Sequence, residues 1–240
     1  MPLGFLLVIS EPGAQVTLEE FQDWYNNEHV PLRLNHLPSF LTGARFSAAD
    51  ALTPSWLAVY DIDDTATFKH ESYTRLRANR SAREANLVQR LEVLDRRTYE
   101  VVSDSGESGL TSSYKPTNPT TVLVTHFLNL SGDDADAAFR SWSDAVSQSL
   151  KGVEGWVRTR TYKCIDNLKT GTSIPTGPEA QIVPEYLAVH ELLSSSVSES
   201  PAFTGAANPG SKADIVEIRK WDLYRAYPSA AQGNVQAPST

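Results

Sequence analysis

The sequence predicts an α+β fold in which two tandem ferredoxin-like β-α-β-β-α-β repeats form an intramolecular, pseudo-dimeric α+β barrel. Strand and helix patterns follow in this order over residues 1–102 and recur in the same order over residues 120–227. Residues 103–119 are rich in Ser, Gly, Thr and Pro and are predicted to be a linker. Each repeat buries one sheet face under helices, so the two remaining faces are expected to pack together.

In the first repeat, a capping box marks the start of the first helix. The Thr17 hydroxyl and the Glu20 carboxylate are spaced to accept backbone N–H groups of the first turn, which places the start near residue 18. Pro31 removes a helical donor, so this helix is predicted to kink or stop just after His29. A second helical region, broken near Asn79, is expected over residues 65–90. Apolar runs and alternation predict the strands at 4–10, 40–47, 56–62 and 94–102.

The second repeat shows the same order with weaker local similarity. Phe139-x-x-Trp142 corresponds to Phe21-x-x-Trp24 of the first repeat. Residues 166–183 are predicted to be an inserted surface loop that covers or gates a cavity, and the small, polar tail at 228–240 is predicted to be disordered. The expected strands are 121–130, 156–165, 184–193 and 215–227, with helices at 134–150 and 194–203.

Composition excludes several classes of function. A net charge of −8 among 240 residues argues against binding nucleic acid, which requires clustered Lys and Arg. Cys164 is the single cysteine, so no internal disulfide is expected and a reducing, cytoplasmic location fits. The apolar run at residues 3–9 is too short to span a membrane. The five His are scattered, so no protein metal site is expected.

An imidazole at the end of the first helix is the most informative feature of the sequence. Tyr25 and His29 share the apolar stripe of the helix, and Glu28 lies beside His29. A histidine in such a place is either a hydrogen-bonded core residue or a functional group. Aligning the two Phe-x-x-Trp pairs places Ser147 opposite His29, so the second repeat lacks the imidazole. This difference favours a functional His29.

The motif W-Y-x-x-E-H-V-P at residues 24–31, followed by residues 38–46, resembles the EthD-like branch of the dimeric α+β barrel superfamily. Ordinary members have about half this length and form the barrel by homodimerisation, so this chain resembles a fused version. The resemblance implies a cofactor-independent lyase of the decarboxylase or dehydratase type, acting on an aromatic or polyketide-like molecule in secondary metabolism. Broader relatives include cyclases, isomerases and monooxygenases. A cyclase or isomerase and a non-catalytic small-molecule carrier are the alternatives.

His29 is the expected catalytic acid and base, because a neutral imidazole can take a proton from a phenol or an acidic carbon and return it. Glu28 is expected to orient His29 or to act as an acid of raised pKa; alternatively, it is a surface carboxylate paired with Arg33. Tyr25, one turn before His29, is expected either to donate a hydrogen bond to a substrate oxygen or only to pack.

The expected substrate-binding residues lie near this stretch in sequence or on the third strand. Trp24 is a cavity wall or core residue, and Tyr60 is placed to reach the cavity. Arg33 and Arg45 either anchor a substrate carboxylate or form exposed salt bridges. His190, at the position that matches Tyr60, belongs to an altered second site or to the core. No cofactor is expected, although haem held by a helix His stays open, and the chain is a monomer with an internal pseudo-dimer or a homodimer.

Overall fold

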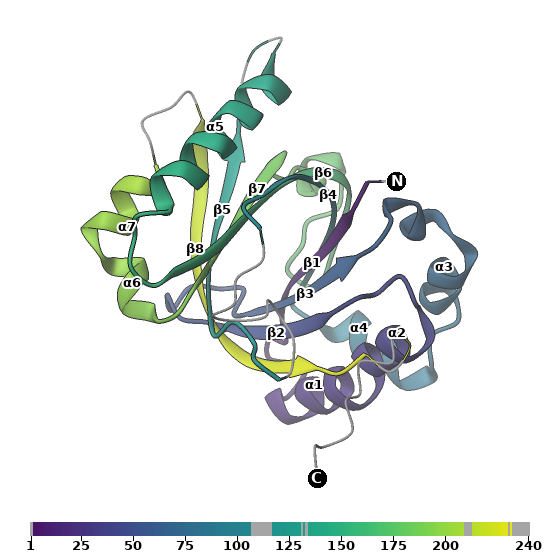
Figure 1. Ribbon diagram of the computed structural model, residues 1–240. Helices are drawn as coiled ribbons and strands as arrows, with labels where there is room; N and C mark the ends of the chain where they lie inside the picture. The colour runs from purple at the N-terminus through teal and green to yellow at the C-terminus, as the bar shows by residue number, and fades with distance from the viewer. Residues whose placement is uncertain are drawn as a thin grey trace.

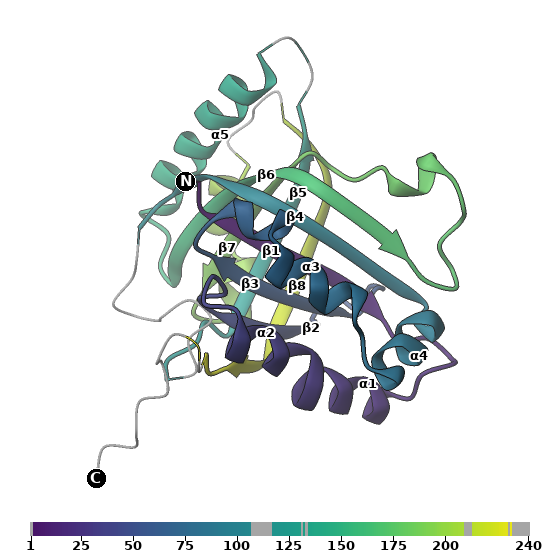
Figure 2. The ribbon, with the colours of Figure 1, turned by 90° about the vertical axis from the view of Figure 1, so that its right-hand side faces the viewer.

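A computed structural model describes residues 2–106, 117–130, 132, 134–208, 213–229 and 231. Its centre is a closed, eight-stranded antiparallel barrel with helices packed on the outside (Figure 1). The helices form two groups on different sides of the barrel. Figure 2, turned by 90°, shows α1 to α4 over one side and α5 over another. This arrangement is the α+β class that the sequence predicts.

The strands are β1 (Gly4–Glu11), β2 (Gly43–Ala48), β3 (Trp56–Ile62), β4 (Val93–Asp104), β5 (Val122–Asn129), β6 (Trp156–Thr170), β7 (Tyr186–Leu192) and β8 (Asp214–Tyr227). The α-helices are α1 (Leu18–Trp24), α2 (Val30–His36), α3 (Glu71–Ala78), α4 (Ala82–Arg90), α5 (Ala135–Leu150), α6 (Ser195–Glu199) and α7 (Pro201–Ala206). A π-helix, η1 (Tyr25–His29), joins α1 to α2, and short 3₁₀-helices occupy Thr65–Lys69 (η2) and Pro178–Gln181 (η3).

The barrel closes in the order β1-β3-β2-β8-β5-β7-β6-β4. Within it, β4-β1-β3-β2 and β8-β5-β7-β6 follow the same order, and the pairs β2–β8 and β4–β6 join the two sets. Every second strand residue points inward, as the pleat requires, and these side chains fill the barrel with a packed core rather than a channel. The core includes Phe5, Leu7, Phe46, Val59, Tyr99, Phe127, Tyr162, Leu187 and Trp221.

A buried arginine strengthens the junction between β8 and the loop that joins β2 to β3. The Arg219 side chain is 1% exposed, and its Nε donates a hydrogen bond to Asp50 at 2.8 Å. Its Nη2 donates to the carbonyl oxygens of Leu52 and Pro54, each at 3.0 Å. The Arg219 side chain on β8 therefore fixes the loop between β2 and β3.

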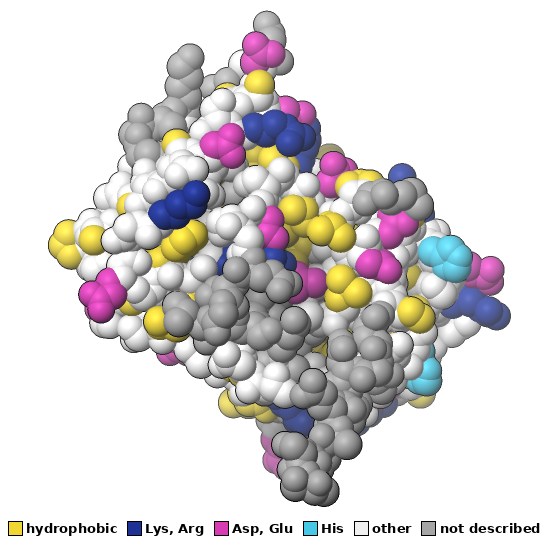
Figure 3. All heavy atoms as spheres, in the orientation of Figure 1, with side chains coloured by type: hydrophobic (Ala, Val, Ile, Leu, Met, Phe, Trp, Pro, Cys, Tyr) yellow, Lys and Arg dark blue, Asp and Glu magenta, His cyan; other side chains and the backbone are white. Residues whose placement is uncertain are grey.

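Two further cores lie between the barrel and its helices. Helices α1 to α4 pack on β1 and β3 through Phe21, Trp24, Tyr25 and other apolar residues. Helices α5 and α7 pack on β5 and β7 through Phe139, Trp142 and their neighbours. Outside these layers, acidic and basic side chains are scattered in small groups over the face shown in Figure 3. Among the described residues, no helix is long and apolar enough to cross a membrane.

The first helix differs from the prediction at its C-terminal end. Thr17 caps its start as expected, accepting a hydrogen bond from the Glu20 N–H at 3.1 Å. The chain does not leave the helical path after His29. It widens into the π-helix, in which the Val30 N–H bonds the Tyr25 carbonyl, and continues as α2. Pro31 is tolerated because it occupies the first turn of α2.

The other predicted elements exist, with three differences. The second strand begins at Gly43, and Phe40 forms only an isolated bridge with Ile62. The predicted loop at 166–183 begins as strand, because β6 continues to Thr170 along β4. The predicted linker overlaps β4 at 103–104, and its residues 107–116 lie outside the described part of the chain.

The predicted disordered tail contains a residue that the structure places firmly. The Ser229 hydroxyl is buried and donates to the carbonyl oxygens of Leu34 and Phe40, at 3.1 and 3.3 Å. Residues 230 and 232–240 lie outside the described part. The prediction of disorder is therefore wrong at Ser229, whose hydroxyl bonds a carbonyl group in the last turn of α2.

Gly171 fixes the turn after β6, and replacing it is expected to destabilise the protein. Its φ is +141°, and a Cβ there would lie 2.2 Å from the Glu92 carbonyl oxygen. Gly171→Ala should lower the free energy of unfolding by about 1–3 kcal/mol through backbone strain and the clash. Urea denaturation measures this, with Gly152→Ala as control because no neighbouring atom lies within 4 Å of that position. Equal stability of the two variants would contradict the expectation.

Candidate active site

His29 and Glu84 form a close pair between the helices of the first half. The His29 Nδ1 lies 2.9 Å from the Glu84 Oε1, and the two side chains are only 13% and 3% exposed. An ionised carboxylate can only accept, so neutral His29 donates its Nδ1–H and keeps a lone pair on Nε2. No described residue forms a hydrogen bond with Nε2. The pair therefore presents an oriented, basic nitrogen.

Local structure sets the positions of both members of this pair. The π-helix places His29 beside the ring of Trp24, at 4.5 Å between centroids, and the ring of Tyr25, at 5.0 Å. Glu84 lies in the first turn of α4, whose N-cap is Ser81. The Ser81 hydroxyl accepts a hydrogen bond from the Glu84 N–H at 3.0 Å. The Glu84 carboxylate bonds His29 instead of capping its own helix. The start of α4 therefore positions this carboxylate next to the imidazole.

Burial and charge keep the imidazole neutral. Burial lowers the pKa of His29 to about 4, and the positive charge of Arg33 acts in the same direction, although the bond to Glu84 opposes both. Burial alone would raise the pKa of Glu84, but the His29 hydrogen bond and the positive groups nearby together hold that pKa below its usual value. At neutral pH the pair is thus an uncharged base held by an ionised carboxylate.

Three aromatic residues predicted for the site are buried in the core under α1 to α4. Trp24 and Tyr25 contact the His29 ring, and Tyr60 belongs to the same core. The Trp24 Nε1 and the Tyr60 Oη are buried and form no hydrogen bond with a described residue, whereas the buried Tyr25 phenol has the Ser10 side chain as a polar neighbour. Burial raises the pKa of both tyrosines, so their phenols stay protonated. Unpaired buried donors are uncommon in proteins, so each calls for an explanation such as a bound water or a catalytic role.

The two predicted arginines are buried, and neither forms the exposed salt bridge that was the alternative expectation. Arg33 is 5% exposed, and its Nη1 donates to the His29 carbonyl at 2.6 Å. Arg45 is 1% exposed, with its guanidinium 4.1 Å from the centre of the Tyr25 ring. It donates to the side-chain oxygen of Gln22, and the Tyr227 phenol is a further polar neighbour. Arg33 supports His29, whereas Arg45 supports Tyr25.

Glu28 is the predicted site residue that the structure turns away from His29. Its carboxylate accepts a hydrogen bond from the Ser81 hydroxyl and lies 3.8 Å from the Arg83 Nη1. Arg33, the alternative partner in the sequence prediction, does not contact it. The contact with the imidazole that was expected of Glu28 is made by Glu84, so Glu28 instead ties η1 to the start of α4.

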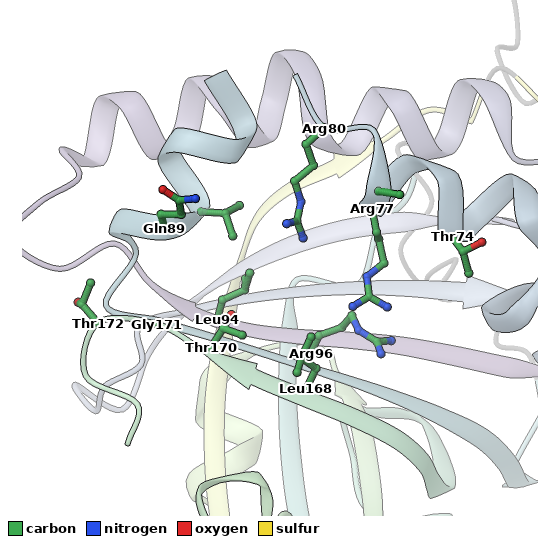
Figure 4. A pocket seen from close by; sticks show the side chains of 12 residues that line it. Thr74, Arg77, Arg80, Gln89, Leu94, Arg96, Leu168, Thr170, Gly171 and Thr172 are labelled. Carbon is green, nitrogen blue, oxygen red and sulfur yellow. The ribbon is translucent and has the colours of Figure 1, made fainter. Parts of the chain in front are cut away.

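A pocket of about 710 Å³ lies between α3, α4 and the strands β4 and β6 (Figure 4). Its floor is formed by Leu94 and Arg96 of β4 and by Leu168 and Thr170 of β6, and its walls come from α3, α4 and the turn at Gly171. The guanidinium groups of Arg77 and Arg96 lie near each other in it, and Arg80 extends into it separately, as Figure 4 shows. The Arg80 Nε lies 3.9 Å from the Glu84 Oε1. Arg80 thus connects the pocket to the pair.

Sequence reasoning missed Glu84 and the three arginines of the pocket. Ser81-x-x-Glu84 has the spacing of a capping box, which could have located the start of α4. That pattern, however, predicts that the glutamate caps its own helix. The arginines belong to a run of alternating charge, a pattern typical of a solvated helix face. Only the packing of α3 and α4 against the sheet turns these side chains towards one cavity.

Two further histidines form a buried pair under the helices of the second half. The rings of His126 and His190 lie 4.7 Å apart, and the Thr159 hydroxyl lies 2.8 Å from the His190 Nδ1. Burial lowers the pKa of His126 to about 4 and that of His190 well below its ordinary value. Neither residue lies near a third potential metal ligand: the described residues contain no group of three His, Cys, Asp or Glu that could hold a metal ion.

No family model and no curated protein matches the sequence. Solved structures do match along almost the whole chain. An anthrone oxidase-like protein superimposes with a TM-score of 0.63 at 12% identity, covering 100% of this chain and 97% of its own. The chain has the fold of these proteins. A candidate monooxygenase from Lactobacillus acidophilus superimposes with a TM-score of 0.53 at 9% identity, covering 94% of this chain and 96% of its own. A candidate chlorite dismutase superimposes with a TM-score of 0.52 at 9% identity, covering 97% of this chain and 97% of its own. Both share this α+β barrel fold.

The pocket lined by Arg77, Arg80 and Arg96, the arginine pocket, does not fit haem. His29 keeps Nε2 for a metal because its Nδ1 is bonded to Glu84, but His29 does not line this pocket. The lining of the arginine pocket contains no His, Cys, Met or Tyr among the described residues. The donor set instead favours chemistry based on proton transfer.

Proposed function

We propose that this α+β barrel is a small-molecule enzyme in which His29 acts as general base and then general acid. The pair formed by His29 and Glu84 is the observation that carries the proposal. A carboxylate that accepts the Nδ1–H of a buried imidazole fixes its orientation and tautomer, leaving Nε2 to exchange protons with a substrate. Buried phenols and an unpaired indole N–H beside it support binding of a polar, aromatic molecule.

The first candidate reaction is a lyase reaction of the decarboxylase or dehydratase type on an aromatic or polyketide-like substrate. In this reaction His29 Nε2 removes a proton from a phenol or an acidic carbon, and Glu84 stabilises the imidazolium that forms. The imidazolium then returns the proton to carbon or to the departing hydroxyl group. The protonated phenols of Tyr25 and Tyr60 would donate hydrogen bonds to a substrate oxygen on which negative charge develops. Cyclisation or isomerisation would use the same first step.

A second candidate is oxidation of such a substrate by dioxygen. The likeness to the anthrone oxidase-like protein over almost the full length of both chains favours it. Here too, the protein would begin by removing a proton with His29, which makes the substrate electron-rich. The two candidates therefore share one residue and one step, and differ in what the deprotonated substrate does next.

We also propose that the chain is a fused tandem repeat of the EthD-like branch, with its catalytic residues in the first repeat. The equal order of β4-β1-β3-β2 and β8-β5-β7-β6 supports a repeat. At the helix position that aligns with His29, the second repeat has Ser147, and no Glu84–His29 pair is formed there. One active cavity per chain is the consequence.

Replacing His29 with alanine tests the proposal. Loss of the general base should lower kcat by about 10²- to 10⁴-fold while substrate affinity is retained. Hydroxylated aromatic acids and anthrones would be screened for release of carbon dioxide or water and for dioxygen uptake. The wild-type rate should fall below about pH 4, where His29 becomes protonated. A His29→Ala variant with normal turnover would refute the role of His29, and a wild type that binds but converts nothing would identify a carrier.

A further inference from the structure

The arginine pocket is unusual because positive charge is concentrated in a protein whose net charge is −8. Its described lining contains Arg77, Arg80 and Arg96 and no acidic residue. Like charges that share a cavity repel one another, and this repulsion is relieved when an anion enters. Burial lowers the pKa of Arg77, and the charges of Arg96 and Arg80 act in the same direction. The protein therefore maintains an arrangement that is unfavourable without a partner.

The ion pairs within the protein neutralise this charge only in part. The Arg96 Nη2 donates to Asp166 at 2.5 Å, but its Nε and Nη1 are buried and have no partner among the described residues. Arg80 faces Glu84 at 3.9 Å, a separation longer than a hydrogen bond. Arg77 has no carboxylate within 4.0 Å in the described part of the chain. Several guanidinium N–H groups thus remain available to an incoming ligand.

The remainder of the pocket is suited to an apolar body. Val88, Leu94 and Leu168 contribute aliphatic surface, and Leu168 is 39% exposed although it lies on a strand. Thr74 on a wall and Thr170 on the floor supply hydroxyl groups. A volume of about 710 Å³ lies within the range of small-molecule sites. The lining therefore combines a cationic end with an apolar floor.

We infer that this pocket binds a small apolar molecule that carries a carboxylate or phosphate group, held by the guanidinium groups of Arg77, Arg80 and Arg96. Guanidinium groups recognise such oxyanions through paired N–H donors. The inference deepens the proposed function, on which it rests for its link to catalysis, by giving the substrate an anionic anchor. Three guanidinium groups would stabilise a carboxylate in its ionised form. The anchored group would therefore be retained through the reaction, and bond breaking would occur elsewhere on the molecule.

Calorimetric titration with three naphthalene derivatives tests the charge requirement on the wild-type protein. 2-Naphthoate should bind at least about 10-fold more tightly than 2-naphthamide, which has the same shape without the charge. 2-Naphthyl phosphate distinguishes the two anions: tighter binding than 2-naphthoate would identify phosphate as the natural group, and weaker binding would identify carboxylate. Equal affinity for 2-naphthoate and 2-naphthamide, or no binding of any probe, would overturn the inference.

Variants test the site itself. Arg77→Gln and Arg96→Gln should each weaken 2-naphthoate binding by about 10- to 100-fold, the range expected for a charge-assisted hydrogen bond. Arg75→Gln is the matched control, because Arg75 lies on the same helix, is 68% exposed and pairs with Glu71. Should Arg96→Gln unfold, Arg77→Gln decides alone, because Arg77 lies on the outer helix α3 and not on a barrel strand. Equal affinities for Arg77→Gln and Arg75→Gln would refute the assignment.

One variant separates this inference from the proposed function. His29→Ala should bind 2-naphthoate as tightly as the wild type, because His29 does not line the pocket. If His29→Ala retains turnover while the arginine variants lose binding, the proposed catalytic role fails and the anion site stands. If His29→Ala loses turnover while the arginine variants bind 2-naphthoate normally, the anion site fails and the catalytic role stands.

Discussion

Glu84→Gln is expected to lower kcat by about 10²- to 10⁴-fold, nearly as much as removal of His29. A glutamine amide can donate a hydrogen bond to His29 Nδ1, which favours the tautomer with the proton on Nε2. The imidazole would then stay in place but lose its basic lone pair on the outward nitrogen. Steady-state kinetics measures the loss, and the ¹⁵N chemical shifts of His29 report the change of tautomer.

Glu28→Gln is the matched control for this experiment. Glu28 lies next to His29 in sequence, but its partners are Ser81 and Arg83. Its replacement should therefore keep most of the turnover and the His29 tautomer. If Glu28→Gln costs more activity than Glu84→Gln, the orienting carboxylate is the sequence neighbour and the assignment of Glu84 is wrong.

Acid is expected to destabilise this protein strongly between pH 6.5 and about pH 4. Burial lowers the pKa of His29 and of His126 to about 4, whereas both would titrate near 6.5 in the unfolded chain. The unfolded state therefore binds more protons in this window, and stability that is present above pH 6.5 is lost as the pH falls. Each of these histidines should contribute about 3 kcal/mol to the loss. Urea denaturation at pH 7 and at pH 4.5 measures it.

His126→Phe isolates the contribution of one imidazole. Phenylalanine has a similar planar shape and cannot be protonated, and the His126 Nδ1 has no hydrogen-bond partner to lose among the described residues. The loss of stability between pH 7 and pH 4.5 should therefore be smaller by about 2 kcal/mol than in the wild type. The exposed His36 provides a control, because His36→Gln should leave this loss unchanged. An unchanged loss in His126→Phe would contradict the account.

Local sequence patterns predicted most of the fold, because strand alternation and helix capping are determined by residues close together in the chain. The Trp56–Ile62 alternation and the Thr17 cap depend on neighbours in sequence, and the structure confirms both. The continuation of β6 to Thr170 was missed because it depends on pairing with β4, far away in the chain. The continuation of the helix beyond His29 was not predicted. It depends on the π-helix η1, after which Pro31 lies in the first turn of α2, and the sequence pattern gives no sign of a π-helix.

Only part of the candidate site could be predicted from the sequence, namely His29 but not its partner Glu84. His29 could be proposed because an imidazole on an apolar stripe is conspicuous, and because Ser147 aligns with it in the predicted second repeat. Its partner Glu84 lies 55 residues further along the chain, so nothing local connects the two. Similarly, the burial of Arg45 arises from the aromatic rings around its guanidinium, which come from separate elements. Such contacts exist only after the chain has folded.

The hydrogen bonds of Arg219 bear on how this molecule unfolds. They attach β8 to the loop after β2, and β4 pairs with β6 on the other side of the barrel. Separating the two sets of strands would break both seams and expose the barrel core, including Trp221, to water. Neither half could keep its inner sheet face covered alone. The barrel should consequently behave as one cooperative unit, despite having an architecture that could be drawn as two.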